Sequence, residues 1–370
     1  MIPIQSITLH KLQMKLKHPF NTSFGTVQNK EFFIIEAKNE AGHIGFGESV
    51  AFTSPWYTEE TTKTTEHIIT DFLIPLLKEN KITHPEDAHE LFAGIRRNNM
   101  AKAAIEMALW DLFAKERTLS LASLLGGKRE YIDVGMSIGM QATTEDLIQK
   151  IEEAIAQGFK RIKLKIAPGK DLQLLDEVRN TFPDLPLMAD ANSAYSLADI
   201  EHLKQLDQFN LMMIEQPLAH DDIVDHARLQ ENIETPICLD ESIHSLEDVK
   251  RAYSLGSCKV INVKAGRVGG LTEAKKIHDF CVENKLDLWC GGMLEAGVGR
   301  AHNIALTSLA GFNLPGDTAG SLHYWQEDII KPYVTVKNGQ IEVPKGLGIG
   351  FEIDRKKLQK YRIKKETFHL

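Results

Sequence analysis

Five short apolar segments between residues 158 and 264 each end on a charged side chain, and these side chains are the first candidates for chemistry. The terminal residues are Lys165, Asp190, Glu215, Asp240 and Lys264. Three carboxylates brought close together repel one another strongly unless a cation neutralises them. Ligand sets made only of oxygen atoms favour Mg2+ or Mn2+ over zinc. The spacing therefore predicts a divalent metal site with Asp190, Glu215 and Asp240 as its ligands.

Lysine side chains flank the carboxylates on both sides. Lys163 and Lys165 are two residues apart, so on a strand both point to the same face. Lys264 comes from the opposite side of the carboxylates. A partly desolvated lysine beside a metal has a lowered pKa and can act as a base, and Arg267 would lower the pKa of Lys264 further if it lay near. A metal that polarises a carboxylate, together with a lysine that removes the α proton, predicts chemistry through an enediolate.

These side chains require a regular series of elements to bring them together. The five terminal residues are separated by 25, 25, 25 and 24 positions, about the length of one strand, one helix and two loops. Amphipathic stretches with helical spacing, such as residues 171–182, fill the intervals. Strand–helix units in series predict a parallel barrel with its chemistry at the carboxyl ends of the strands. We expect further strands ending near Ser137, at 286–290 and at 312–315.

The rest of the chain predicts a second, smaller domain. Residues 2–50 have the pattern of a strand meander, and three helices are expected at 61–75, 85–96 and 99–115. Turn residues at 126–130 place the boundary between this domain, residues 1–127, and a barrel over residues 128–324. Hairpin patterns from about residue 325 to 370, including an expected hairpin of 333–337 with 340–343, indicate that the tail packs back on the smaller domain.

Composition excludes several classes of protein. The 370 residues carry a net charge of -8 with no basic tract, which argues against a nucleic-acid partner. Nothing approaches 18 consecutive apolar residues, and the first residues lack a signal-peptide core, so no membrane partner is expected. The four cysteines form no Cys-x-x-Cys pair and predict reduced, buried thiols in a cytoplasmic protein.

Five motifs together resemble the enolase superfamily, in its muconate-lactonizing-enzyme-like branch. They are Lys163-x-Lys165, Asp190-Ala191-Asn192, Glu215-Gln216-Pro217, Asp240-Glu241-Ser242, and Lys264 with Val268-Gly269-Gly270. Residues 54–61 and 290–295 resemble more closely the group of bacterial o-succinylbenzoate synthases and related N-acylamino acid racemases. The likeness spans essentially the whole chain.

The resemblance implies an α/β fold, a TIM-like (β/α)7β barrel with an α+β N-terminal capping domain, and one Mg2+ on the three carboxylates. In the synthase reaction, a syn dehydration that leads towards menaquinone, Lys165 would remove the proton α to the substrate carboxylate. It would then return a proton to the departing hydroxyl, while Lys264 stabilised the enediolate. In racemisation the two lysines would instead act on opposite faces, one removing and one delivering the proton.

The resemblance also implies how a small-molecule carboxylate substrate is held. Lys163 would bind a carboxylate oxygen, and the loops at 20–25 and 52–57 would close over the site. Further substrate contacts are implied at Ser137, Asn192, Gly292, Met293 and Leu294. An even-numbered homo-oligomer is expected from the resemblance alone.

Other activities of the superfamily fit less well. Sugar-acid dehydratases use a histidine at the end of the seventh strand, and residues 288–291 contain none. Dipeptide epimerases carry an Asp-x-Asp pair near the last strand, where this chain has only Asp317. Muconate cycloisomerases keep the same lysines, although Trp56 and Met293-Leu294 favour the synthase group. A barrel that binds ligands without catalysing a reaction would be expected to lack one of the three lysines or one of the three carboxylates, and this chain has all six. Dehydration and racemisation both stay open, because they use the same lysines, metal and enediolate.

Overall fold

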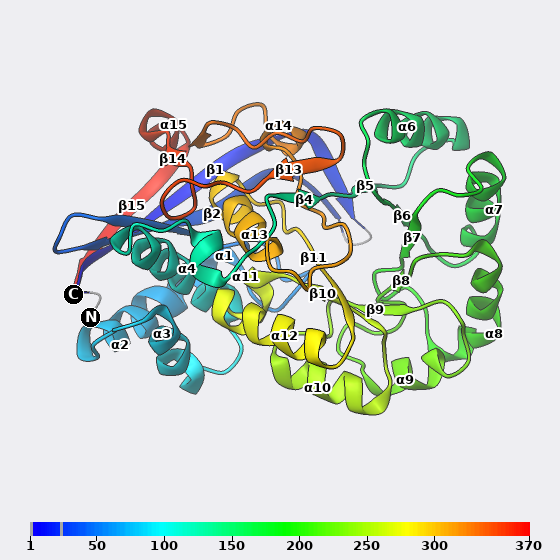
Figure 1. Cartoon of the computed structure of the whole chain (residues 1–370), viewed down its shortest axis with the longest axis horizontal. Coiled ribbons are helices and arrows are strands. Elements are labelled where there is room, and N and C mark those ends of the chain that lie inside the picture. The colour runs from blue at the N-terminus through cyan, green and yellow to red at the C-terminus, as the bar shows by residue number, and fades with distance from the viewer. Residues whose placement is uncertain (1–2, 23–24) are drawn as a thin grey trace.

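An antiparallel sheet with a helix across its face organises the N-terminal part of the chain. The computed structural model describes residues 3–22 and 25–370, without the side chains of 20–25, so the predicted loop at 20–25 lies largely outside the described residues. The sheet has four strands in the order β15 (Arg362–His369), β1 (Ile4–Thr22), β2 (Gly25–Asn39) and β3 (Ile44–Glu48). Figure 1 shows this sheet beside the cyan helices of the same part of the chain.

Two glycines on β3 let the longest of these helices, α4 (Asn99–Glu116), approach the sheet closely. Gly45 and Gly47 are two residues apart and so face the same side of the sheet. A Cβ atom at Gly45 would lie 2.2 Å from the carbonyl oxygen of Ala108, and one at Gly47 would lie 2.1 Å from that of Ala104. The contact between helix and sheet is therefore backbone against backbone. It buries α4 on nearly all sides.

The helix predicted at 61–75 is longer than expected. It runs as α1 (Thr62–Ile68), a π-helical turn η1 (Ile69–Leu73) and α2 (Ile74–Glu79), so Pro75 lies inside it rather than at its end. A proline has no N–H to donate to the preceding turn, and the wider π turn before it accommodates that loss. The other helices of this part are α3 (Pro85–Leu91), the 3-10 turn η2 (Phe92–Gly94) and α5 (Leu121–Leu125).

The predicted barrel is confirmed as seven parallel strands in sequence order. They are β5 (Met136–Ile138), β6 (Ile162–Lys165), β7 (Leu187–Asp190), β8 (Ile214–Glu215), β9 (Ile237–Leu239), β10 (Val260–Val263) and β11 (Asp287–Cys290). The connecting helical segments cover the outside of the sheet, as Figure 1 shows in green and yellow. They are α6 (Thr144–Ala156), α7 (Asp171–Thr181), η3 (Leu197–Asp199), α8 (Ile200–Leu203), η4 (Lys204–Phe209), α9 (Val224–Gln230), α10 (Leu246–Leu255), α11 (Ala265–Val268), α12 (Leu271–Glu283) and α13 (Gly297–Thr307).

The last barrel strand, expected at 312–315, does not form a regular ladder. Single hydrogen bonds close the ring instead. Leu314 N donates to Leu288 O at 3.4 Å, Asp317 N donates to Cys290 O at 2.9 Å, and on the other side Gly135 N donates to Gly316 O at 2.8 Å. Pro315 lies in the middle of this segment and has no N–H to donate, which interrupts the ladder. The barrel is closed at this position by four residues of irregular chain.

The tail after the barrel pairs with several distant segments. β13 (Gln340–Glu342) pairs with β4 (Tyr131–Asp133), and β12 (Ile330–Lys331) pairs with β14 (Glu352–Ile353). In the chain, helix α14 (Ser321–Tyr324) precedes β12, and helix α15 (Arg355–Tyr361) follows β14. The first arm of the predicted hairpin, 333–337, is not a strand, because β13 pairs with β4 and only Lys337 bridges Gln340. β15 pairs with β1 along the sheet edge. The division of the chain at residue 127 stays a prediction.

The interior of the barrel is filled below the level of the charged residues. Its buried layer consists of Met188, Met213, Cys238, Val260 and Trp289. These side chains come from five different strands or their starts, so they close the floor beneath the carboxyl ends of the strands. Among the described residues, no helix is long and apolar enough to cross a membrane.

Candidate active site

Strand register brings the charged residues to one edge of the barrel. Lys165 pairs with Asp190, and Asp190 pairs with Glu215, across three neighbouring parallel strands. Residues paired in this way project from the same face of a sheet. Asp240 directly follows β9, and Lys264 directly follows β10. The regular spacing in the sequence thus becomes a row of carboxylates with a lysine at each end.

Lys163 lies in the centre of this row and is almost fully buried. Its Nζ atom is 2.7 Å from Asp317 Oδ2, 3.1 Å from Glu215 Oε2 and 3.5 Å from Asp190 Oδ2. Burial lowers the pKa of Lys163, but these three carboxylates, Asp317 foremost, raise it well above the ordinary value. Lys163 is therefore a permanent cation, suited to hold an anionic oxygen.

Lys165 is the most accessible of the three lysines. Its side chain is 28% exposed, against 8% for Lys163 and 9% for Lys264. Lys165 Nζ lies 2.7 Å from Asp190 Oδ2 and donates a second hydrogen bond to Asn192 Oδ1. Asn192 Nδ2 in turn donates to Glu241 Oε1 at 3.2 Å. This lysine is the one that a ligand entering the barrel mouth can reach.

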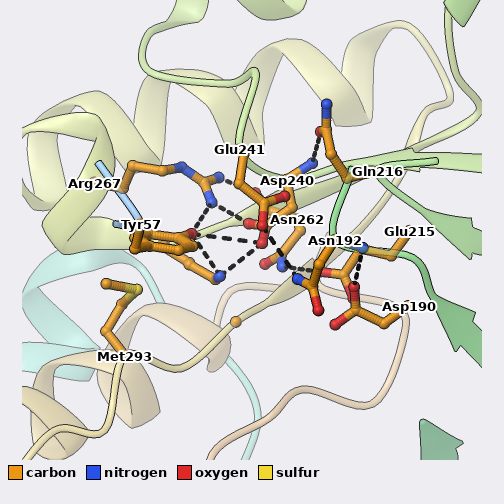
Figure 2. Close-up of polar contacts among 12 residues, drawn as sticks. Tyr57, Asp190, Asn192, Glu215, Gln216, Asp240, Glu241, Asn262, Arg267 and Met293 are labelled. Carbon is orange, nitrogen blue, oxygen red and sulfur yellow. Dashed lines mark hydrogen bonds and ion pairs between the residues drawn. The ribbon is translucent and has the colours of Figure 1, made fainter. Parts of the chain in front are cut away.

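Lys264 is held from the other side by the capping domain. Its Nζ donates to Asp240 Oδ2 at 2.7 Å and to the Tyr57 hydroxyl at 2.8 Å, and it lies 4.8 Å from the centre of the Tyr57 ring. Arg267 Nη1 donates to Asp240 Oδ1 and, at 3.1 Å, to the same hydroxyl. Figure 2 shows Tyr57 and Arg267 converging on Asp240.

The charged neighbours of Lys264 in this arrangement act on its pKa in opposite directions. Burial lowers this pKa and so does Arg267, as predicted. The carboxylate of Asp240 and the Tyr57 hydroxyl act in the opposite direction and outweigh them, so the net pKa lies above the ordinary value. The sequence suggested that Arg267 could lie near, but not that Asp240 bonds Lys264 directly.

The three predicted metal ligands are buried acids that lie close enough to affect the pKa values of one another. Asp190, Glu215 and Asp240 are each at most 2% exposed. Burial, Asp190 and Asp240 raise the pKa of Glu215 to about 8, although Lys163 lowers it. Burial raises the pKa of Asp240, but Lys264 and Arg267 lower it by more, to well below its ordinary value.

A donor set of carboxylate oxygens without histidine or cysteine fits a hard divalent cation. In the structure, the oxygen atoms of these carboxylates accept hydrogen bonds from lysine and arginine side chains. Over the described parts of the chain, no group of three or more His, Cys, Asp or Glu side chains is gathered closely enough to hold an ion.

The remaining predicted substrate contacts surround the same cluster. Ser137 Oγ donates to Asp317 Oδ1 at 3.1 Å, and a Cβ atom at Gly292 would lie 3.3 Å from the Asp317 carbonyl oxygen. Met293 is buried in a cluster with Val50, Ala51 and Met100, against which Phe52 and Tyr57 pack. The second loop that was predicted to close over the site is 52–57. Its Trp56 side chain is 64% exposed and precedes Tyr57 in the chain.

Several residues that the sequence did not single out as site residues support the cluster. Asp317 binds Lys163, Ser137 and also Arg161, at 2.9 Å. Asn262 Nδ2 donates to Glu215 Oε1 at 2.7 Å, and Gln216 Oε1 accepts from Asp240 N at 3.0 Å. Asn262 was detectable, because it precedes Lys264 by two residues and so shares its strand face.

A cavity of about 370 Å3 lies outside this cluster, between α3, α4, α10 and α12. Its lining includes Arg97, Arg251, Asp248 and Glu273, and so carries both signs of charge. Asp248 is already bonded to Arg251, and Glu273 lies 3.2 Å from His89. The predicted site residues lie in the ion-paired cluster at the strand ends, and none of them lines this cavity.

Two family models match the chain. Residues 4–126 match the mandelate racemase / muconate lactonizing enzyme N-terminal domain, and residues 146–357 match the enolase C-terminal domain-like model. The chain belongs to the enolase superfamily. Enzymes of this superfamily act on small molecules and generally use a divalent metal.

Individual members of the enolase superfamily are similar to the chain over its full length. It is 58% identical to an o-succinylbenzoate synthase of Geobacillus kaustophilus, covering 100% of this chain and 98% of the relative. It is 44% identical to an N-succinylamino acid racemase of Thermus thermophilus, covering 95% of each. A crystal structure of an enolase superfamily member from Listeria innocua superposes with a TM-score of 0.98 at 49% identity, covering 100% of both chains.

Proposed function

We propose that the chain is an o-succinylbenzoate synthase that dehydrates 2-succinyl-6-hydroxy-2,4-cyclohexadiene-1-carboxylate. The observation that carries this proposal is the row of Lys165, three buried carboxylates and Lys264 on consecutive strand ends. The row stands in a chain 58% identical throughout to a protein of that name. A lysine at each end of a row of carboxylates suits removal of a proton α to a substrate carboxylate.

Each residue of the row has a role in this proposal. Lys165, as the free amine, takes the α proton and then returns a proton to the departing hydroxyl, so that the C–O bond breaks and water leaves. Protonated Lys264 stabilises the negative charge of the enediolate from the other side, and Lys163 holds a carboxylate oxygen. Asp190, Glu215 and Asp240 would hold Mg2+, which supplies a Lewis acid for the substrate carboxylate. Asn192 keeps the Lys165 amine directed along the row.

A second candidate activity is racemisation of N-succinylamino acids. The observation that favours it is the placement of Lys165 and Lys264 at opposite ends of the row, in a chain 44% identical to an N-succinylamino acid racemase. In that reaction one lysine removes the α proton and the other delivers one to the opposite face. Both reactions share the same enediolate.

Four further attributes belong to this proposal. The metal is Mg2+, with Mn2+ as an alternative, and the assembly is an even-numbered homo-oligomer. The capping domain comprises residues 1–127 together with about 325–370, over a barrel of 128–324. The enzyme acts in the cytoplasm, which is supported by four cysteines that are buried and unpaired.

Parallel kinetic assays test the proposed activity. The purified protein with Mg2+ is given the cyclohexadiene substrate, whose absorbance is followed, and separately N-succinyl and N-acetyl amino acids, whose optical rotation is followed. We expect kcat/KM for dehydration to exceed that for racemisation by a large factor. The reverse ranking would assign the chain to the racemases. Inactivity on both, with metal bound, would refute both and direct attention to muconate-type lactones.

A further inference from the structure

A buried lysine of the capping sheet contacts a turn beside the candidate active site. Lys30 lies on the inner strand β2 and is 1% exposed. Its Nζ donates to the carbonyl oxygens of Met293 at 2.8 Å and Leu294 at 2.9 Å. It also lies 5.7 Å from the ring centre of Phe32 and 5.5 Å from that of Phe52. An ammonium in such a place has a large desolvation cost, so these contacts must be specific for it to remain charged.

The turn that Lys30 holds has an unusual backbone. Leu294 has a φ of 56°, in the left-handed region that a branched residue rarely adopts. As in a helical turn, successive carbonyls in this region lie on the same side of the chain, so both can reach one ammonium. Glu295 Oε2 accepts a hydrogen bond from Met293 N at 2.9 Å and fixes the other side of the turn. The conformation of Leu294 persists because its surroundings determine it.

The Met293 side chain connects this turn to the catalytic groups. It is buried in a cluster with Val50, Ala51 and Met100, against which Tyr57 packs. Figure 2 shows Met293 beside the Tyr57 ring. The Tyr57 hydroxyl accepts a hydrogen bond from Lys264 Nζ at 2.8 Å. A displacement of the turn would therefore be transmitted through Tyr57 to Lys264.

We propose that Lys30 is a positioning residue, which ties the Met293-Leu294 turn to the capping sheet and thereby sets how well the site holds and aligns its substrate. This inference rests on the proposed function, because Met293 and Leu294 are substrate contacts only if the chain has the activity that its resemblance implies. Lys30 touches no reacting atom. Its role is to fix the turn that the substrate and Tyr57 contact.

The test compares Lys30→Met with a matched control, Lys115→Met. Lys115 is also a largely buried lysine that donates to a backbone carbonyl, Ile44 O at 2.8 Å, and lies 5.0 Å from the Phe46 ring centre. It is bonded to Asp111 on α4 rather than to the turn. Both variants lose a buried charge, so both are expected to lower the unfolding temperature.

Only Lys30→Met is expected to change the site. KM for the substrate should rise about tenfold or more, with a smaller change in kcat, because the turn is expected to contact the bound substrate and not the reacting atoms. The ε-methyl resonance of Met293, in protein labelled with [13C-methyl]methionine and assigned with Met293→Leu, should shift or broaden in Lys30→Met and not in Lys115→Met. A folded Lys30→Met protein with the wild-type KM and the wild-type Met293 resonance would overturn the proposal.

A second variant covers the case in which Lys30→Met does not fold. Lys30→Gln keeps one donor group for the two carbonyls but removes the ammonium, so it should displace the Met293 resonance and raise KM by less than Lys30→Met. An unchanged resonance and an unchanged KM in Lys30→Gln would overturn the proposal. If the wild-type protein dehydrates and racemises nothing, the proposed function fails, while the Met293 resonance still decides whether Lys30 positions the turn.

Discussion

Replacement of Lys165 by alanine is the most direct test of the proposed base. Lys165 is the accessible amine of the row, with a side chain 28% exposed, and its neighbours Asp190 and Asn192 offer no equivalent group. A positioned general base contributes about 10²- to 10⁴-fold to a rate. Because Lys165 serves as both base and acid in the dehydration, we expect a loss of at least about 10⁴-fold, or about 5 kcal/mol of transition-state stabilisation.

The fold should tolerate this change. Asp190 keeps Lys163 at 3.5 Å after Lys165 is removed, so no buried carboxylate loses its last cation. The lost ion pair is partly exposed and is expected to contribute about 1 kcal/mol or less to the free energy of unfolding. Circular dichroism, thermal unfolding and calorimetric titration with Mg2+ should therefore be close to those of the wild type.

Proton exchange in deuterated water separates the two lysines. Each enantiomer of an N-succinyl amino acid is incubated with enzyme, and loss of the α-proton signal is followed by NMR. Lys165→Ala should abolish exchange of one enantiomer and Lys264→Ala exchange of the other, because the lysines lie at opposite ends of the row. Dehydration by Lys165→Ala within tenfold of wild type, or loss of exchange from the same enantiomer in both variants, would refute the assignment.

Four further perturbations test other parts of the site and fold. Tyr57→Phe removes the hydroxyl that bonds Lys264 and should lower kcat/KM about tenfold, the effect of one hydrogen bond to a charged group; steady-state kinetics measure it. Chelation by EDTA should abolish activity and added Mg2+ restore it, whereas Asp190→Asn should raise the Mg2+ concentration for half-activation by about tenfold or more. Burial raises the pKa of Glu36, but the hydrogen bond with His10 and other contacts lower it to about 2. Its stabilisation is thus complete above pH about 4.5 and is lost as the pH falls towards 2. Glu36→Gln should therefore cost about 1 to 2 kcal/mol at pH 7, after solvent screening, and flatten this acid limb in urea titrations.

The repeating part of the fold was predictable because one physical unit recurs. The period near 25 residues located the strands from β6 to β10, and the stretch with helical spacing at 171–182 is found as α7 (Asp171–Thr181). Irregular positions were not predictable in the same way. Pro75 was expected to end a helix that instead runs on to Glu79, and closure of the barrel around Pro315 depends on hydrogen bonds to two separate strands.

The candidate site likewise contains residues that the sequence could place and contacts that it could not. Residues placed by strand periodicity, such as Lys165 and Asp190, were predictable because register follows from parallel pairing. Tyr57 binds Lys264 across 207 residues of sequence, and Asp317 binds Arg161 across 156. Such contacts depend on how distant segments pack, which no local pattern encodes.

The pairing of β1 with β15 has a consequence for the order of folding. Ser6 lies opposite His369, so the strand made first is completed only by the strand made last, after the whole barrel has been synthesised. Until then the part of β1 that β15 covers, from Ser6 to Leu12, has backbone groups without a strand partner on its outer edge. On the ribosome the barrel segment therefore emerges while this edge is still open, and during that interval the nascent chain is exposed to pairing with another copy of itself.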